Sequence, residues 1–248
     1  MWRVTVPSFE EVVRSWTRPV NGQYPRPWMS KMTDPTRATG FIVGRNQATP
    51  FPVGLLPNHE AFVDALFNRN GQSHAELYER ARAAMGKGPS PTRGNIERLT
   101  ALLERGGVEG VLETNVICYS TSMSSDLRDA AHAGGKEAGK GIFRALLRAI
   151  QPRIIIAHGA ATRTDLEKIL GVTLPAVPEG PDAGVKGKEV TLPGSDPPKR
   201  ALVLVIPALA PPGWNKWSSW APMWLERLAE RAAEYVRGSG PGSAPADA

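Results

Sequence analysis

The chain has 248 residues, of which 41% are hydrophobic and 22% are charged. This composition is typical of a globular protein and excludes a fibrous or wholly disordered chain. A single cysteine, Cys118, excludes an intrachain disulfide framework and a four-cysteine metal site. No apolar run reaches the roughly 18 residues of a membrane-spanning helix, and the first residues form no apolar signal core. We therefore expect a cytoplasmic protein that makes no membrane contact.

The charge balance is basic, with 30 Lys and Arg against 24 Asp and Glu and a net charge of +6. Such a balance is compatible with a nucleic-acid partner but does not require one, because many basic proteins bind no DNA. The basic residues are spread along the chain without forming a tail, and the four histidines have no metal-ligand spacing.

Apolar periodicity, helix caps and glycine or proline breaks divide the chain into helices and strands. A helix capped by Ser8 comes first, then a proline-rich loop and a short apolar strand. In chain order the predicted elements are helix 9–16, strand 40–44, helices 58–70, 73–85 and 95–105, strand 110–117, helix 142–150, strand 153–157, helix 160–170, a loop or hairpin insertion over 171–200, strand 201–206, helix 223–236 and a disordered tail over 238–248.

Four wholly apolar strands that alternate with helices predict a single α/β domain over residues 1–237. We expect three α/β/α layers around a central, mostly parallel four-stranded sheet. Ligands of such sheets bind beyond the carboxyl ends of the strands. Polar residues gather at three of these predicted ends, at Arg45-Asn46, at Asn115 and at His158. This convergence predicts the functional site.

These residues have ordinary alternatives. Gly44-Arg45-Asn46-Gln47 has the composition of a simple turn, Asn115 could be an edge amide, and Phe51 could be a core aromatic. An amide nevertheless suits a reader of nucleobases, because one side chain both donates and accepts hydrogen bonds.

The same segments resemble the uracil-DNA glycosylase superfamily. Gly44-Arg45-Asn46-Gln47 after a buried strand is similar to its first motif, GxDPY or GxNP. Val111-Leu112-Glu113-Thr114-Asn115-Val116 looks like its second strand, whose terminal asparagine reads the uracil edge. The family's order of helix, apolar strand and glycine continues in segments 139–143 and 154–159, and Pro207–Gly213 stands where the second catalytic motif falls.

The resemblance implies a monofunctional glycosylase of base excision repair that hydrolyses the N-glycosidic bond of uracil in DNA, with no metal or cofactor. Asn46 would orient the water, Phe51 would stack on the base and Asn115 would read its edge, beside Gly44, Arg45 and Gln47. Two departures stand out, since Gln47 replaces the motif's proline and no histidine lies near Pro207. His158 is the candidate to stabilise the departing base.

The implied partner is single- or double-stranded DNA that carries a deaminated base, bound by a monomer. The segment with Pro211, Trp214, Asn215 and Lys216 would contact this DNA. Its tryptophans have an alternative role, because Trp217 and Trp220 could pack the last helix onto the core. Two other functions stay open, a glycosylase for hypoxanthine or another deaminated base and a catalytically weak nucleic-acid-binding module.

Two further signals favour structural roles. Gly134–Gly141 nearly fits the phosphate-binding pattern GxxxxGK[ST], but Gly141 replaces the hydroxyl residue, so the segment is predicted to be a helix entry. Cys118 could be imagined as the nucleophile of an amidase with His158 as its base. No sharp turn presents it, and a small buried filler is the favoured role.

Overall fold

The structure is a computed structural model, and it describes residues 7–194 and 197–238. Two predictions concern residues outside the described ranges. These are the disordered tail, apart from Gly238, and the absence of a signal core, as far as it concerns residues 1–6. The chain divides into two compact units. Unit 1 comprises the residues up to Thr36, Asn46–Gly88 and Thr114–Ala149, and unit 2 comprises Arg37–Arg45, Pro89–Glu113 and the residues from Ile150. The single domain over 1–237 stays a prediction.

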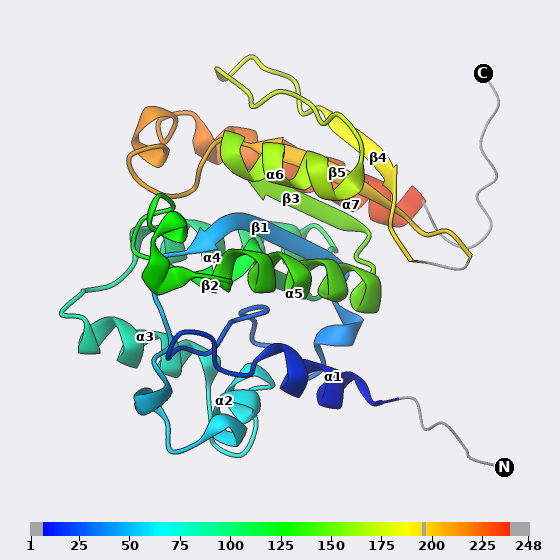
Figure 1. Cartoon of the computed structure of the whole chain (residues 1–248). Coiled ribbons are helices and arrows are strands. Elements are labelled where there is room, and N and C mark those ends of the chain that lie inside the picture. The colour runs from blue at the N-terminus through cyan, green and yellow to red at the C-terminus, as the bar shows by residue number, and fades with distance from the viewer. Residues whose placement is uncertain (1–6, 195–196, 239–248) are drawn as a thin grey trace, which may run out of the picture. The chain divides into compact units, whose positions relative to one another are not determined.

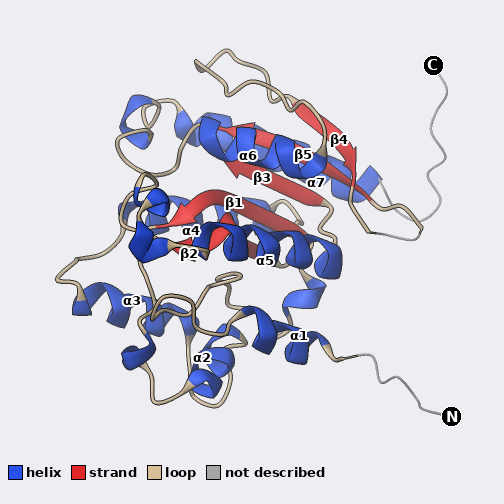
Figure 2. Cartoon of the chain, viewed as in Figure 1, coloured by secondary structure: helices blue, strands red, loops and turns tan. Residues whose placement is uncertain are grey.

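A five-stranded, mostly parallel sheet with the order β2-β1-β3-β5-β4 organises the fold (Figure 2). β3 pairs in parallel with both β1 and β5, whereas β4 is antiparallel to β5. The predicted α/β class is confirmed, but the predicted number of four strands is wrong. β4 lies in the segment 171–200, predicted as a loop or hairpin insertion, and its antiparallel pairing with β5 fits the hairpin alternative. The sequence did not count it as a fifth strand because only Val190 in Gly-Lys-Glu-Val-Thr is buried, as suits a polar edge strand. The bounds are β1 Gly40–Gln47, β2 Val111–Ser120, β3 Ile154–His158, β4 Gly187–Thr191 and β5 Arg200–Ile206.

Helices cover both faces of the sheet in unit 2. Alternate residues of β3 and β5 point to opposite faces, and Ile154, Ile156, Leu202 and Leu204 share one buried cluster with α4 (Pro91–Arg105) and α7 (Ala221–Gly238). The helix α6 (Ala160–Leu170) lies on the other face, in front of β3 and β5 in Figure 1. Of the helices in the described ranges, none is long and apolar enough to cross a membrane.

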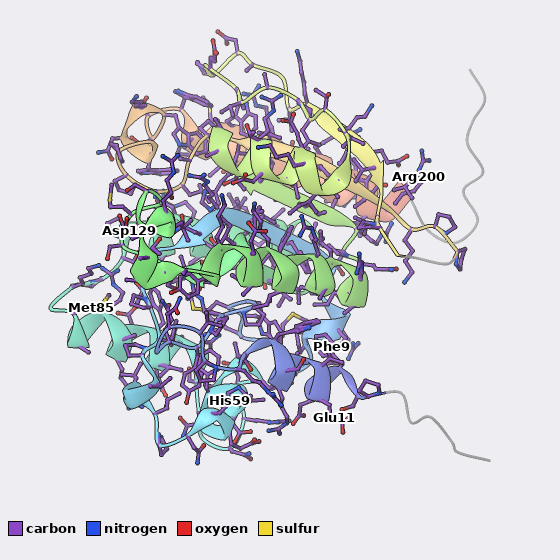
Figure 3. All side chains as sticks on the ribbon, viewed as in Figure 1. Phe9, Glu11, His59, Met85, Asp129 and Arg200 are labelled. Atoms are coloured by element: carbon purple, nitrogen blue, oxygen red, sulfur yellow. The ribbon has the colours of Figure 1, made fainter. Side chains whose placement is uncertain are left out.

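Unit 1 contains three capped helices around an aromatic core. Ser8 and Glu11, the latter labelled in Figure 3, form a capping box that starts α1. Phe9 of that helix stacks on Trp28 with 6.0 Å between ring centroids. Asn58 and Ser73 cap the next two helices through their side chains. The helix bounds are α1 Phe9–Trp16, α2 His59–Leu66 and α3 His74–Ala84.

The glycine-rich segment before residue 142 belongs to a helix. α5 spans Gly135–Ile150, whereas the sequence predicted its start at Ile142. A Cβ atom at Gly135 would lie 2.5 Å from the Tyr119 ring, and one at Gly139 would lie 2.9 Å from the backbone nitrogen of Cys118. The two glycines therefore let α5 pack directly on β2, and this packing outweighs their low helix propensity.

Candidate functional site

The Asn46 amide is held in one orientation near the end of β1. Its Nδ2 donates to Thr121 Oγ1 at 3.0 Å, and the Ser124 hydroxyl donates to its Oδ1 at 2.5 Å. The Thr121 hydroxyl in turn donates to the Met123 carbonyl at 2.7 Å, so its oxygen is left to accept from Asn46. This chain of donors fixes which end of the amide is the oxygen. The oxygen retains a second lone pair that can accept a hydrogen bond from a water molecule.

Gln47, the next residue of β1, is buried and bonded at both ends of its amide. Nε2 donates to the Arg26 carbonyl at 2.6 Å, and Oε1 accepts from the Ser120 hydroxyl at 3.1 Å. These bonds join β1 to Ser120 at the end of β2 and to Arg26 in the loop that precedes β1. Gln47 therefore stabilises the end of β1, and both the nitrogen and the oxygen of its amide are bonded within the protein.

Phe51 lies in the aromatic core of unit 1 and has no exposed surface. Its ring centroid is 5.7 Å from that of Phe62 and 5.6 Å from that of His74. The Arg26 guanidinium lies 5.4 Å from the ring centroid. The structure thus favours the core-aromatic alternative over a face that stacks on a base.

Asn115 lies inside β2, five residues before its end at Ser120, and not at the strand end that the sequence predicted. The strand bends here, because Thr114 Oγ1 and Cys118 Sγ are 3.8 Å apart, whereas four residues of straight strand span about 13 Å. The Cys118 thiol donates to the Asn115 carbonyl at 3.1 Å within this bend. Such irregularities of a strand redirect a side chain away from the regular alternation.

Asn115 is only 6% exposed, and its amide forms no hydrogen bond to any residue that the structure describes. The amide atoms are not among the fully buried polar atoms that lack a partner, so they reach the surface of the protein. The free donor and acceptor of Asn115 are therefore available to a ligand that offers the complementary pair.

Cys118 is fully buried, as the sequence predicted for a small filler. Burial raises the pKa of its thiol to about 12, so the thiol stays protonated near neutral pH. A thiol in this state is no nucleophile, and the structure gives the amidase alternative no support.

In unit 2, the predicted base-binding residues Gly44 and Arg45 belong to β1 itself. Gly44 is buried within the strand. Arg45 Nε forms an ion pair with Asp165 Oδ2 of α6 at 3.0 Å. This pair joins β1 to α6 and gives Arg45 a structural role.

His158 ends β3 opposite Ile206 of β5 and is half-buried. It points to the same face as Ile154 and Ile156, the face that α4 covers. Burial lowers the pKa of His158 to about 4, although the carboxylate of Glu113 opposes the shift. Glu113 is itself paired with Arg93 of α4. At neutral pH the imidazole is uncharged, so it can act as a hydrogen-bond donor without a positive charge.

The segment after β5 folds back on a buried tryptophan. Trp217 is 2% exposed and donates from Nε1 to the Ala208 carbonyl at 3.0 Å, which confirms the packing alternative for this residue. Trp214 is half-buried and meets Trp217 edge to face, with 5.1 Å between ring centroids. Three predicted DNA-contacting residues remain exposed, namely Pro211, Asn215 and Lys216.

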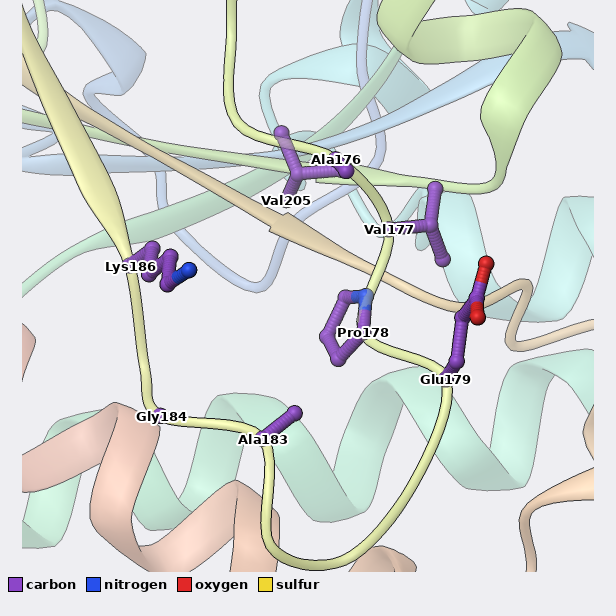
Figure 4. A pocket seen from close by; sticks show the side chains of 8 residues that line it. All are labelled: Ala176, Val177, Pro178, Glu179, Ala183, Gly184, Lys186 and Val205. Atoms are coloured by element: carbon purple, nitrogen blue, oxygen red, sulfur yellow. The ribbon is translucent and has the colours of Figure 1, made fainter.

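A cavity of about 210 Å³ opens elsewhere in unit 2, between Val205 of β5 and the segment that precedes β4 (Figure 4). Glu179 and Lys186 are its charged residues, and small apolar side chains supply most of the remaining wall. None of the predicted site residues lines this cavity.

The predicted site residues therefore fall into two sets, each within its own unit. Asn46, Gln47 and Asn115 lie with Phe51 in unit 1, and Gly44, Arg45, His158 and the segment after β5 lie in unit 2. The sequence did not single out Thr121 and Ser124, whose only signal was a run of hydroxyl residues after a strand. Comparison of the chain with models of known families and with curated proteins finds no match.

Proposed function

We propose that this protein is a monofunctional DNA glycosylase that hydrolyses the N-glycosidic bond of uracil. The observation that carries the proposal is the Asn115 amide, whose donor and acceptor have no partner in the described protein and reach the surface although the residue is only 6% exposed. Uracil offers an N3–H donor beside a carbonyl acceptor, and one amide can pair with both. Cytosine offers the reverse pattern, and its rejection requires that the bound base finds the amide in one orientation only; a mismatched group then costs about 1–3 kcal/mol.

Asn46 supports the same chemistry. Hydrolysis needs a water molecule held against the sugar while the bond to the base breaks. The fixed Asn46 oxygen can accept a hydrogen bond from this water, although a neutral amide cannot take its proton as a carboxylate would. In unit 2, neutral His158 stays a predicted hydrogen-bond donor.

The expected partner is DNA, bound by a cytoplasmic monomer that needs no metal or cofactor. The base must leave the helical stack before Asn115 can read its edge, which costs a few kcal/mol in duplex DNA and less in a single strand. Exposed Lys216 and Asn215 would contact the phosphate backbone.

The test is incubation of the purified protein with oligonucleotides that contain uracil, hypoxanthine or xanthine, followed by alkali. Strand cleavage only after uracil supports the proposal. Cleavage only after hypoxanthine or xanthine would contradict uracil as the substrate and identify the other base in its place. A gel shift without any cleavage would identify a nucleic-acid-binding module. Asn46→Ala is the matched control, because it should keep the gel shift while the single-turnover rate falls roughly 10²-fold.

A further inference from the structure

Four basic side chains lie in one row along α5. Lys136, Lys140, Arg144 and Arg148 follow one another at intervals of four residues, and residues at this spacing are neighbours on the surface of a helix. Arg144 and Arg148 are exposed, and the two lysines are half-buried. We call these four residues the α5 row. They form no block of charge in the sequence, so only the helix brings them together.

The α5 row concentrates positive charge on one helix. Four basic residues against one acidic residue, Glu137, leave α5 with a charge of +3, which is half of the net charge of +6. Lys140 Nζ lies 3.6 Å from Glu137 Oε1, whereas the other three members form no ion pair with any residue that the structure describes. The exposed face of α7 differs, because its arginines alternate with glutamates at Glu226, Arg227, Glu230, Arg231 and Glu234.

The row does not stabilise the helix that carries it. Like charges four residues apart repel each other, and Lys136 in the first turn faces the positive end of the helix dipole. The opposite face of α5, with Phe143 and Leu147, is fully buried, so no apolar face is left to enter a membrane. These properties favour a negatively charged partner that binds at the protein surface.

The row begins beside the strand end that holds Asn46. Gly135, the residue before Lys136, lies against the Tyr119 ring, and Thr121, two residues further on, accepts from Asn46 Nδ2. From there the row follows α5 along β2 (Figure 1) and covers about 18 Å of helix. One strand of duplex DNA places about five phosphates along such a length. A rigid, straight row of charges therefore matches a regular row of phosphates.

We propose that the α5 row binds the phosphate backbone of duplex DNA that flanks the target nucleotide, and this inference rests on the proposed function. Lys and Arg side chains neutralise phosphates and release counterions without reading the sequence. Such contacts fix the register and orientation of a protein on the duplex. A duplex fits the row better than a single strand or a flexible acidic peptide, because only the duplex holds its charges in a rigid, regular row.

The experiment compares two double variants, Arg144→Gln with Arg148→Gln on α5 and Arg98→Gln with Arg105→Gln on α4. Both remove two exposed arginines from a long helix, but Arg98 and Arg105 each follow a glutamate directly in the chain. The affinity for a labelled, uracil-free duplex is measured by fluorescence anisotropy over a range of salt concentrations. The α5 variant should reduce the slope of log affinity against log salt by about two units, and the α4 variant should leave it unchanged.

Kinetics and unfolding separate DNA binding from a structural role. On a uracil-containing duplex the α5 variant should raise KM roughly 10-fold, with most of its effect in KM and not in the single-turnover rate. Its free energy of unfolding should not fall, because the change relieves repulsion between like charges. A lower free energy of unfolding together with an unchanged salt slope would give the row a structural role and overturn the proposal.

The outcomes distinguish the row from the glycosylase. An unchanged salt slope, or an equal reduction in both variants, overturns the row as a DNA-binding surface, while continued excision of uracil keeps the glycosylase. A reduced slope in the α5 variant of a protein that excises no base supports the row and overturns the glycosylase. Phosphatidylserine vesicles provide a further arm, since vesicle binding that only the α5 variant loses, with an unchanged DNA slope, replaces DNA by a lipid surface. Wild type that neither binds the duplex nor excises uracil overturns both proposals.

Discussion

Two buried asparagines show how the same side chain can serve stability or recognition. Asn95 of α4 is 8% exposed and donates from Nδ2 to the Leu209 carbonyl at 2.9 Å. Asn115 is as deeply buried, but its amide has no partner among the described residues. The two residues are indistinguishable in the sequence, because the difference depends on a bend in β2 and on a carbonyl 114 residues away.

This contrast predicts opposite effects of alanine. Asn115→Ala should cut uracil excision at least 10²-fold and change the free energy of unfolding by less than about 1 kcal/mol, since no protein hydrogen bond is lost. Asn95→Ala should lower the free energy of unfolding by about 1–3 kcal/mol, because it orphans a buried carbonyl. Urea unfolding and single-turnover excision measure the two effects. A large loss of stability in Asn115→Ala would show that this amide has a structural role.

The lowered pKa of His158 predicts that the free energy of unfolding depends on pH. Its pKa is about 4 in the folded protein because of burial, against an ordinary value near 6.5. As the pH falls from 6.5 to 4, the unfolded chain takes up a proton that the folded state does not, so stability is lost in this window. The groups that act on it are the Glu113 carboxylate and, through its ion pair, Arg93.

His158→Gln removes this titration. Its free energy of unfolding should therefore fall less steeply than that of wild type between pH 6.5 and 4, by at most about 1.4 kcal/mol per pH unit. Urea unfolding at half-unit steps of pH tests this. Parallel curves for the two proteins would mean that His158 is protonated in the folded state at its ordinary pKa.

At the scale of elements, the sequence predicted what depends on local patterns and missed what depends on distant contacts. The four strands with apolar runs and the capped helices were found, because period, cap and glycine signals are local. β4 was not counted as a strand because an edge strand needs few apolar residues. The start of α5 was missed because glycine has a low helix propensity. Gly135 and Gly139 are helical because only glycine lets the helix pack this closely on β2.

The two glycines 139 and 141 of α5 test that explanation. A Cβ atom at position 139 would lie 2.9 Å from the backbone nitrogen of Cys118, whereas one at position 141 would meet no atom within 4 Å. Gly141→Ala should stabilise the protein by up to about 1 kcal/mol through helix propensity. Gly139→Ala should destabilise it by about 1–3 kcal/mol, because backbone must move. Thermal unfolding of both variants decides; stabilisation by Gly139→Ala would refute the close packing of α5 on β2.

At the scale of the whole molecule, the net charge of +6 is the property that concerns a nucleic-acid partner. It is no evidence of fold, and spread charge is weak evidence of function. If the protein binds DNA, its affinity for DNA should fall as the salt concentration rises, because each phosphate contact by Lys or Arg releases counterions. The slope of log affinity against log salt counts these contacts, so single lysines can be placed on or off the DNA path.

Lys216 is the lysine that the proposed function places on this path. It is exposed in the segment after β5, and Lys216→Ala should reduce the salt slope by about one unit and weaken binding to all DNA sequences alike. Lys168 is the matched control, because it is equally exposed in unit 2 but lies in the last turn of α6, which begins at the carboxyl end of β3 and runs away from it. Lys168→Ala should leave the slope unchanged. Fluorescence anisotropy with a labelled duplex at four or more salt concentrations measures both variants. An unchanged slope for Lys216→Ala places the segment after β5 off the DNA path, and an equal reduction for both variants would mean that binding depends on the total charge and not on a defined contact.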